Sequence, residues 1–308
     1  MSDVHNMSYY TKCMMGGILS CGLTHTAVVP LDLIKCRRQV NHEVYKSLSD
    51  GFKVIKAAEG ARGLTVGWVP TFIGYSMQGF GKFGFYEIFK DVYKKIVGEE
   101  NAQKYQTVGF LVSSACAEFI ADVLLCPMEA LKVRTQVDMK GQFPRNPVKG
   151  FNLIKSKEGV NGFYKGLGPL WMRQIPYTMV KFACFERTVR FVYANILTKD
   201  PSEYSKATRL SVTFLSGYWA GIFCAVVSHP ADTMVSKLNE ASSEGSTAEK
   251  VKGIYKEIGF KGLWRGLSTR ILMVGTLTGL QWWIYDSFKT AAGLAATGTE
   301  KKKVKATS

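Results

Sequence analysis

The chain has 308 residues, of which 46% are hydrophobic and 30 are glycines, and its formal net charge is +16. Long apolar, glycine-rich segments argue against a soluble globule, because glycine is enriched in membrane-spanning helices that pack closely. The basic residues are spread between the apolar runs and no zinc, bZIP or RNP pattern occurs, which excludes the common nucleic-acid-binding modules. The charge favours instead a membrane protein that meets anionic lipid and an anionic substrate.

Six segments of the chain are long enough to cross a bilayer. Each exceeds the roughly 20 residues that span about 30 Å of hydrocarbon, and we expect the longer ones to be tilted or bent at proline. The mean hydropathy is close to zero, which indicates helices with one polar face along a water-filled path. An even number of spans places both ends of the chain on one side. The predicted spans are residues 11–38, 69–95, 107–137, 168–195, 208–238 and 268–290.

One sequence box recurs near the end of three of these spans. A proline is followed two residues later by an acid and five and seven residues later by bases, starting at Pro30, Pro127 and Pro230, except that Val235 replaces the first base of the third box. Each box is followed by an acidic-glycine turn, namely Glu59-Gly60, Glu158-Gly159 and Glu257-Ile258-Gly259. An acid after an aromatic residue then closes each unit, at Glu87, Glu186 and Asp286. We therefore predict three repeats, residues 1–98, 99–198 and 199–308, the last with a basic C-terminal tail.

The three boxes resemble the P-x-[DE]-x-x-[KR]-x-[KR] motif of the mitochondrial carrier family, and the resemblance covers nearly the whole chain. Within that family, the segments 22–26, 117–122, 174–177, 228–232 and 275–278 are most similar to members that carry inorganic phosphate. The resemblance implies an all-α membrane protein with six transmembrane helices in three pseudo-three-fold repeats, each with a short amphipathic helix on the matrix side. It places the protein in the mitochondrial inner membrane, with both termini on the intermembrane-space side.

The resemblance also implies a function. We expect a transporter that is not an enzyme, that works as a monomer without a cofactor, and that moves phosphate together with a proton by alternating access. Symport with a proton and exchange for hydroxide are equivalent descriptions of this coupling.

The seven cysteines form no C-x-x-C pair, no metal-ligand cluster is evident, and no hydrophobic signal segment or Arg-rich presequence begins the chain.

Acids and bases at fixed spacing near the helix ends predict two rings of charge. The resemblance implies that the first ring is a matrix gate and the second a cytoplasmic gate, each with three acids and two bases because valine replaces the third base. The alternative is that these charges only anchor helix ends at the membrane interface. Bridges worth about 1 kcal/mol where water reaches them would suit a gate that must reopen. The matrix gate comprises Asp32, Lys35, Glu129, Lys132 and Asp232, braced by Gln39 and Gln136; the cytoplasmic gate comprises Glu87, Lys90, Glu186, Asp286 and Lys289.

Polar positions that differ between the repeats are candidates for the substrate site, because the substrate has no three-fold symmetry. Ionisable groups inside a membrane protein are functional candidates by default. Lys82, Lys181 and Gln281 occupy one shared repeat position, which is basic in only two of the three. The candidates are His25, Gln78, Lys82, Glu118, Asp122, Arg173 and Lys181.

We assign these candidates to two tasks. Lysine and arginine suit a phosphate-like anion, so Lys82, Lys181 and Arg173, with Gln78, are predicted to hold the substrate. Carboxylates would repel an anion unless a proton travels with it, so Glu118, with His25 and Asp122, is predicted to take up that proton.

Structural alternatives remain open for several of these residues. His25 could be a core histidine bonded to a backbone carbonyl, and Asp122 could be a structural partner of Lys82 or Arg173. The two lysines could instead extend toward the membrane interface. Another carrier of the same fold, for example for a copper complex, or a receptor or channel without coupled transport, would also fit the pattern.

A lipid site is the last prediction. Tyr164-Lys165-Gly166 and Trp264-Arg265-Gly266 place an aromatic residue, a cation and a glycine at a helix start, where backbone N–H groups bind phosphates. In the family such places bind cardiolipin, so Gly166 and Gly266 are predicted contacts of an anionic lipid. Repeat 1 departs from this pattern with Thr65-Val66-Gly67.

Overall fold

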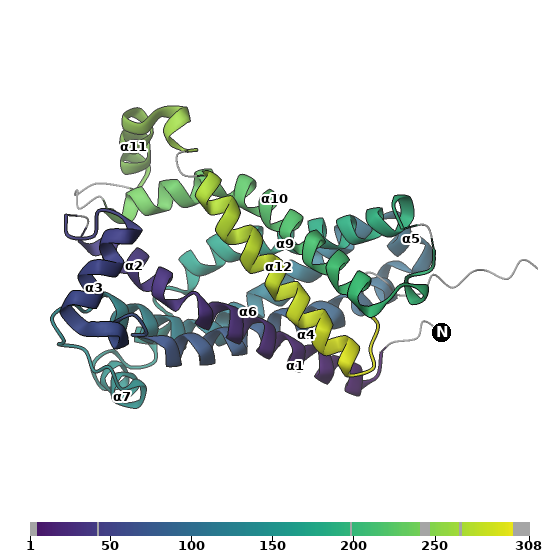
Figure 1. The fold of residues 1–308 in the computed structure, drawn as a ribbon, viewed down its shortest axis with the longest axis horizontal. Coiled ribbons are helices and arrows are strands. Elements are labelled where there is room, and N and C mark those ends of the chain that lie inside the picture. Colours follow the sequence, from purple (N-terminus) through teal and green to yellow (C-terminus); the bar gives the residue numbers. More distant parts are fainter. Residues whose placement is uncertain (1–4, 42, 198, 241–246, 265–266, 298–308) are drawn as a thin grey trace, which may run out of the picture.

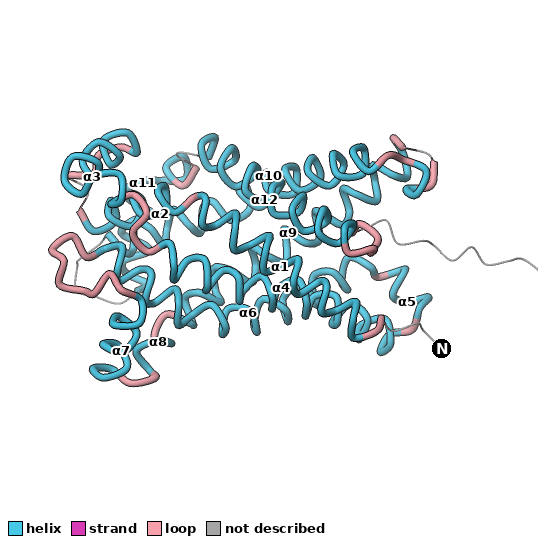
Figure 2. The backbone as a smooth tube through the Cα atoms, turned by 60° about the horizontal axis from the view of Figure 1, so that its bottom comes forward, coloured by secondary structure: helices cyan, strands magenta, loops and turns pink. Residues whose placement is uncertain are grey.

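The computed structural model describes residues 5–41, 43–197, 199–240, 247–264 and 267–297. Within this part of the chain the regular structure is entirely helical (Figures 1 and 2). Six long rods run along the length of the molecule and pack side by side into a closed ring. In ring order the helices are α1 (Met7–Ala27), α4 (Trp68–Val97), α6 (Gln106–Val137), α9 (Leu167–Asn195), α10 (Lys206–Glu240) and α12 (Leu267–Ala291).

These rods match the predicted spans to within a few residues, with one difference. The predicted span 11–38 is divided into α1 and α2 (Val29–Val40), which meet at a bend of 57°. Pro30 lies in the first turn of α2, where its missing N–H leaves no hydrogen bond unmade. Pro127 and Pro230, at the equivalent positions, lie inside the continuous helices α6 and α10.

The two ends of the molecule differ in what they carry. The N-terminal and C-terminal described residues lie at one end, which we call the termini end, where Lys12 of α1 donates a 2.8 Å hydrogen bond to the carbonyl of Ala292. The opposite end, the loop end, carries the short helices α3, α7, α8 and α11 (Figure 2). The shorter elements are α3 (Leu48–Gly63), α5 (Glu99–Lys104), α7 (Pro147–Glu158), α8 (Asn161–Tyr164), η1 (Pro201–Glu203) and α11 (Thr247–Gly262).

In every repeat, a glycine with positive φ lies just after the acidic residue near the C-terminal end of the loop-end helix. Gly60, Gly159 and Gly259 have φ of 68°, 64° and 62°. Glycine adopts this left-handed conformation without the steric cost that a side chain would bring. The acidic-glycine turns found in the sequence are therefore the points where the loop-end helix breaks and the chain turns back toward the next long helix.

The distribution of side chains is inverted relative to a soluble protein. Glu118 and Asp122 are completely buried between helices, whereas Met172 is 82% exposed and Leu215 is 65% exposed on the outer surface. Exposed apolar side chains and buried charges together are typical of a protein in lipid. By length and hydropathy alone, α6 and the first 25 residues of α10 qualify as spans among the described residues, and the bent pair α1–α2 qualifies if taken as one span.

Glycines allow two pairs of long helices to pack in close contact. A Cβ atom on Gly17 of α1 would lie only 2.1 Å from the carbonyl oxygen of Gly79 on α4. A Cβ on Gly221 of α10 would lie 2.7 Å from the Cα of Gly275 on α12. Small residues at such crossings let backbones approach each other, as in other membrane helix pairs. These crossings hold the rods that carry the charged residues described next.

Candidate transport site and charged rings

A buried cluster of charged and amide side chains lies between α4 and α6. The ammonium of Lys82 is 3.0 Å from a carboxylate oxygen of Glu118. The amide of Gln78 donates to Glu118 at 2.8 Å and to Asp122 at 3.2 Å. Lys82, on α4, is 4% exposed, and the two acids on α6 are fully buried. One lysine thus faces two carboxyl groups one helical turn apart.

A second polar group joins three different helices. Lys181 of α9 donates a 3.1 Å hydrogen bond to the side-chain oxygen of Gln281 on α12. The amide nitrogen of Gln281 lies 3.4 Å from Nδ1 of His25 on α1. The same Nδ1 lies 3.0 Å from the Cys21 carbonyl, and the imidazole stacks on Tyr75 with ring centroids 3.7 Å apart. Gln281 therefore lies between a predicted substrate residue, to which it is hydrogen-bonded, and a predicted proton-coupling residue.

Lys181, unlike Lys82, has no carboxylate close to its ammonium group among the described residues. It is 2% exposed, and no carboxylate within the described part of the chain lies within 4.0 Å of its ammonium. Its other close neighbours are the rings of Tyr177 and Phe182, with centroids 5.6 and 5.7 Å from Nζ. Burying a cation is unfavourable unless it gains a partner, so Lys181 is the strongest candidate here for binding an anion.

Arg173 is more exposed than the other candidate residues. It is exposed near the loop end of α9, whereas the other two predicted cations are buried. His25 is half-buried. The structure thus brings His25 and Lys181 together through Gln281, and Gln78, Lys82, Glu118 and Asp122 together by direct contact.

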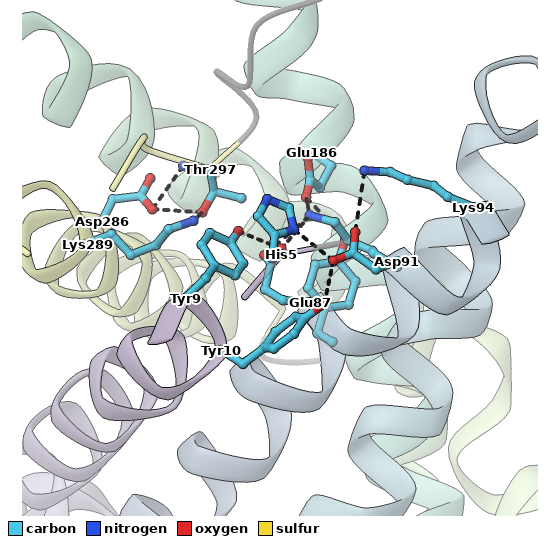
Figure 3. Close-up of polar contacts among 12 residues, drawn as sticks. His5, Tyr9, Tyr10, Glu87, Asp91, Lys94, Glu186, Asp286, Lys289 and Thr297 are labelled. Atoms are coloured by element: carbon cyan, nitrogen blue, oxygen red, sulfur yellow. Dashed lines mark hydrogen bonds and ion pairs between the residues drawn. The ribbon is translucent and has the colours of Figure 1, made fainter. Parts of the chain in front are cut away.

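The termini-end ring is formed by the five residues predicted for the cytoplasmic gate, and Figure 3 shows it from close by. Lys90 lies 3.1 Å from Glu87 one turn away on α4 and 3.3 Å from Glu186 on α9, so it bridges repeats 1 and 2. Tyr9 of α1 donates to Glu87 at 3.0 Å. Arg190 lies 3.9 Å from Glu186. Asp286 and Lys289 both contact Thr297 in the C-terminal segment.

A layer of buried aromatic rings lies directly beside this ring of charge. Each repeat contributes the residues four and one positions before its acid, and all six are at most 1% exposed. The rings of Phe185 and Trp282 stack at 3.6 Å, and those of Phe83 and Tyr285 at 4.2 Å. The layer closes the termini end with apolar surface. Its members are Phe83, Tyr86, Phe182, Phe185, Trp282 and Tyr285.

The loop-end ring is formed by residues predicted for the matrix gate, and it is more exposed. Lys132 of α6 pairs with Asp32 of α2, joining repeats 1 and 2, and also lies 3.4 Å from Glu129. The side chain of Asp32 is 33% exposed, that of Glu129 is 20% exposed, and Lys35 is exposed. The side chain of Asp232 lies outside the described residues. The termini end is therefore the more tightly closed of the two.

The predicted bracing glutamines are only partly described. The side chain of Gln39 lies outside the described residues. Gln136 is fully buried. Its side-chain nitrogen lies 3.4 Å from the Val66 carbonyl, and its backbone carbonyl accepts from Arg37 at 3.1 Å. Its observed contacts connect α6 to α2 and to the turn before α4, and its role as a brace of the gate stays a prediction.

Two arginine–glutamate links at the loop end were not predicted from the sequence. In the first two boxes the last basic residue pairs with the acid before the loop-end glycine, Arg37 with Glu59 and Arg134 with Glu158. Lys165 adds a 2.8 Å contact to Glu158. Two hydrogen bonds from Arg134 and one from Lys165 lower the pKa of Glu158 to about 2. The recurrence of both residues at matching repeat positions was the signal that could have revealed these links.

The predicted lipid contacts are only partly described. Gly166 is the N-cap residue of α9, at a helix start as expected, and Gly266 lies outside the described residues. In repeat 1, where the motif is absent, a cavity of about 170 Å³ opens at the start of α4. Arg62 and Arg145 line it beside Gly67 and Trp68. Two cations and a helix N-terminus are thus present there without the motif.

The comparisons with known proteins agree with this architecture. The family model of mitochondrial carrier proteins matches the chain three times, over residues 6–97, 103–195 and 206–294. The chain belongs to the mitochondrial carrier family. The three matches follow the three repeats, although the boundaries that we predicted between the repeats stay predictions.

Relatives of the carrier are similar over almost its whole length. The mitochondrial phosphate carrier protein of Caenorhabditis elegans is 58% identical over 292 residues, covering 93% of this chain and 82% of the relative. A probable mitochondrial phosphate carrier protein of Schizosaccharomyces pombe is 52% identical and covers 96% of this chain and 95% of the relative. Human solute carrier family 25 member 3 is 53% identical, covering 93% of this chain and 77% of the relative.

Proposed function

We propose that this carrier transports inorganic phosphate across the mitochondrial inner membrane together with a proton. The relatives named as phosphate carriers support the substrate and the compartment. The observation within the molecule that supports an anion is Lys181, a buried ammonium with no carboxylate within 4.0 Å among the described residues. Phosphate oxygens would supply the negative charge that this lysine lacks.

Charge balance supports the accompanying proton. Lys82 and Lys181 carry two positive charges, and Glu118 and Asp122 carry two negative charges when both are ionised. A phosphate monoanion added to this set would leave one negative charge uncompensated in a buried site. One proton on the carboxyl pair removes that excess, so phosphate and proton enter together at lower cost.

The carboxyl pair is the proposed place of this proton. Gln78 donates from one nitrogen to both acids, which holds them side by side whether or not one is protonated. Lys82 contacts only Glu118 by ion pairing among the described residues, so loss of the Glu118 charge would release the ammonium toward phosphate. His25 lies 3.4 Å from the amide nitrogen of Gln281, whose oxygen accepts from Lys181, and this closeness to the proposed anion site supports its part in proton coupling.

Alternating access is the proposed mechanism of passage. The termini-end ring and its aromatic layer are buried, while the loop-end ring is partly exposed. We assign the termini end to the intermembrane space and the loop end to the matrix, so that this structure is closed toward the intermembrane space. Opening at the termini end would require Lys90 to release Glu186, an interaction weak enough to break once water enters.

The test is uptake of labelled phosphate into liposomes that contain the purified carrier, with and without a pH gradient. We expect uptake that rises when the compartment supplying phosphate is the more acidic. Uptake of phosphate that ignores the gradient would refute the proton coupling. No uptake at all would refute the substrate assignment and leave the family assignment intact.

A further inference from the structure

The termini-end ring lacks one cation, and the structure shows what replaces it. Lys90 of α4 reaches across to Glu186 of α9. By the pseudo-symmetry of the repeats, a base at position 189 of α9 would reach Asp286 of α12 in the same way, but that position is Val189. Asp286 is completely buried, and it forms no ion pair within 4.0 Å among the described residues.

The C-terminal segment supplies the missing partner (Figure 3). The backbone N–H of Thr297 donates to one oxygen of Asp286 at 3.1 Å, and its hydroxyl donates to the same oxygen at 2.8 Å. The hydroxyl of Thr213 on α10 donates to the other oxygen at 2.9 Å. Lys289 donates to the Thr297 hydroxyl at 3.3 Å. A buried carboxylate needs such donors when it has no cation beside it.

The geometry after α12 brings Thr297 to this position. The helix ends at Ala291, and Gly293, with a φ of 78°, reverses the chain. The N–H of Leu294 donates to the carbonyl of Lys289 at 2.8 Å, which closes the turn in the way that helix C-termini commonly end at glycine. Thr297 is 1% exposed, so it is inserted into the ring rather than lying on its surface.

We propose that the segment 293–297, which we call the C-terminal latch, is the third closing contact of the termini-end gate. In this view Thr297 must leave Asp286 each time the carrier opens at that end, just as Lys90 must leave Glu186. A hydrogen bond to a charged group is strong enough to help close the gate and weak enough to be broken in each transport cycle. The inference rests on the proposed alternating access, but not on phosphate being the substrate.

The test uses Cys13, which is fully buried among the aromatic residues beside the ring. The carrier in liposomes is treated with a membrane-impermeant maleimide, and the labelled fraction of each cysteine is followed over time by mass spectrometry. Thr297→Val removes the hydroxyl and keeps the shape, whereas Thr297→Ser keeps the hydroxyl. We expect Thr297→Val to speed labelling of Cys13 about tenfold, because one hydrogen bond to a carboxylate is lost. Thr297→Ser should label at the rate of the unmodified carrier.

Cys224 separates opening of the gate from general loosening. It is buried in a different apolar cluster, with Ala225 and Val274, and should keep its slow labelling in both variants. Equal acceleration at Cys13 and Cys224, or no acceleration at Cys13 in Thr297→Val, would overturn the latch. Neither readout involves phosphate, so failure of phosphate uptake would refute the proposed substrate without deciding the latch.

Discussion

Lys82 and Glu118 form a buried ion pair at 3.0 Å between two neighbouring long helices. Removing one partner of such a pair leaves an uncompensated charge in the interior, which is costly. In a transporter this energetic cost can couple two binding events, because any event that neutralises Glu118 also frees Lys82. A proton arriving at the acid and an anion arriving at the lysine would then favour each other.

Lys181→Met tests the anion site. The substitution keeps an unbranched side chain of similar length and removes a buried cation that has no carboxylate within 4.0 Å in the described part of the chain. We expect phosphate uptake below saturation to fall about 10- to 100-fold, the loss that follows when a charge-assisted contact is removed. Lys149→Met, on the exposed surface of α7, is the control and should transport at the normal rate. Normal uptake by Lys181→Met would exclude this lysine from the site.

Gln281→Leu tests the connection between Lys181 and His25. The amide accepts from the lysine at 3.1 Å and lies 3.4 Å from the imidazole, and leucine can do neither. We expect uptake to fall about tenfold, because a buried ammonium loses its hydrogen-bond acceptor. The dependence on pH should change as well, since His25 loses a neighbour. A change in the uptake rate with an unaltered pH profile would mean that His25 plays no part in proton coupling.

Gly17→Ala tests the close crossing of α1 and α4. A Cβ at this position would lie 2.1 Å from the Gly79 carbonyl oxygen, so the helices must move apart. We expect the unfolding temperature in detergent to fall by several degrees, because overpacking costs about 1–3 kcal/mol. Gly168→Ala is the matched control, since its Cβ meets no atom within 4 Å and its φ is negative. Equal unfolding temperatures of the two variants would contradict the close contact between α1 and α4 at Gly17.

The pKa of Glu158 predicts how the stability of the Arg134–Glu158 link depends on pH. Hydrogen bonds from Arg134 and Lys165 lower its pKa from an ordinary 4.5 to about 2. A lowered pKa means that the stabilisation is fully present above pH 4.5 and is lost as the pH falls toward 2. The difference in melting temperature between the unmodified carrier and Glu158→Gln should therefore be constant from pH 7 to about 5 and shrink below pH 4.5.

The control for this measurement is Glu43→Gln. Glu43 is exposed in the loop before α3 and forms no ion pair among the described residues. Its substitution should leave melting unchanged at each pH. If the Glu158→Gln difference stayed the same down to pH 3, the link would not depend on the charge of this carboxylate.

The sequence predicted the long helices well, because each repeat carries its own markers. Apolar length located the rods, and Pro127 and Pro230 marked the boxes within them. A bend at proline was expected for the longer spans, but its location at Val28 could not be predicted. Pro30, Pro127 and Pro230 occupy equivalent positions, and yet among the described long helices only α1 breaks from its continuation, α2. The choice between bending and continuing depends on packing against neighbouring helices, which single-chain patterns do not contain.

Residues of the candidate site could be predicted where one repeat carries a different polar residue from the other two. Comparing the repeats singled out Lys82, Lys181 and Glu118, which the structure places in buried contacts. The same comparison found Gln281 at the repeat position of both lysines but did not count it among the candidates. Thr297 carried no signal at all, because its role depends on a chain reversal after α12 and on the valine at position 189.

Glu118→Gln tests most directly whether phosphate and a proton are carried together. Glutamine keeps the shape and the hydrogen bond with Gln78 but cannot gain or lose a proton. In liposomes, the unmodified carrier should accumulate labelled phosphate in response to a pH gradient. The variant should bring phosphate in only to equilibrium, or not at all, whatever the gradient. Accumulation by Glu118→Gln that followed the pH gradient as in the unmodified carrier would exclude Glu118 as the group that carries the proton.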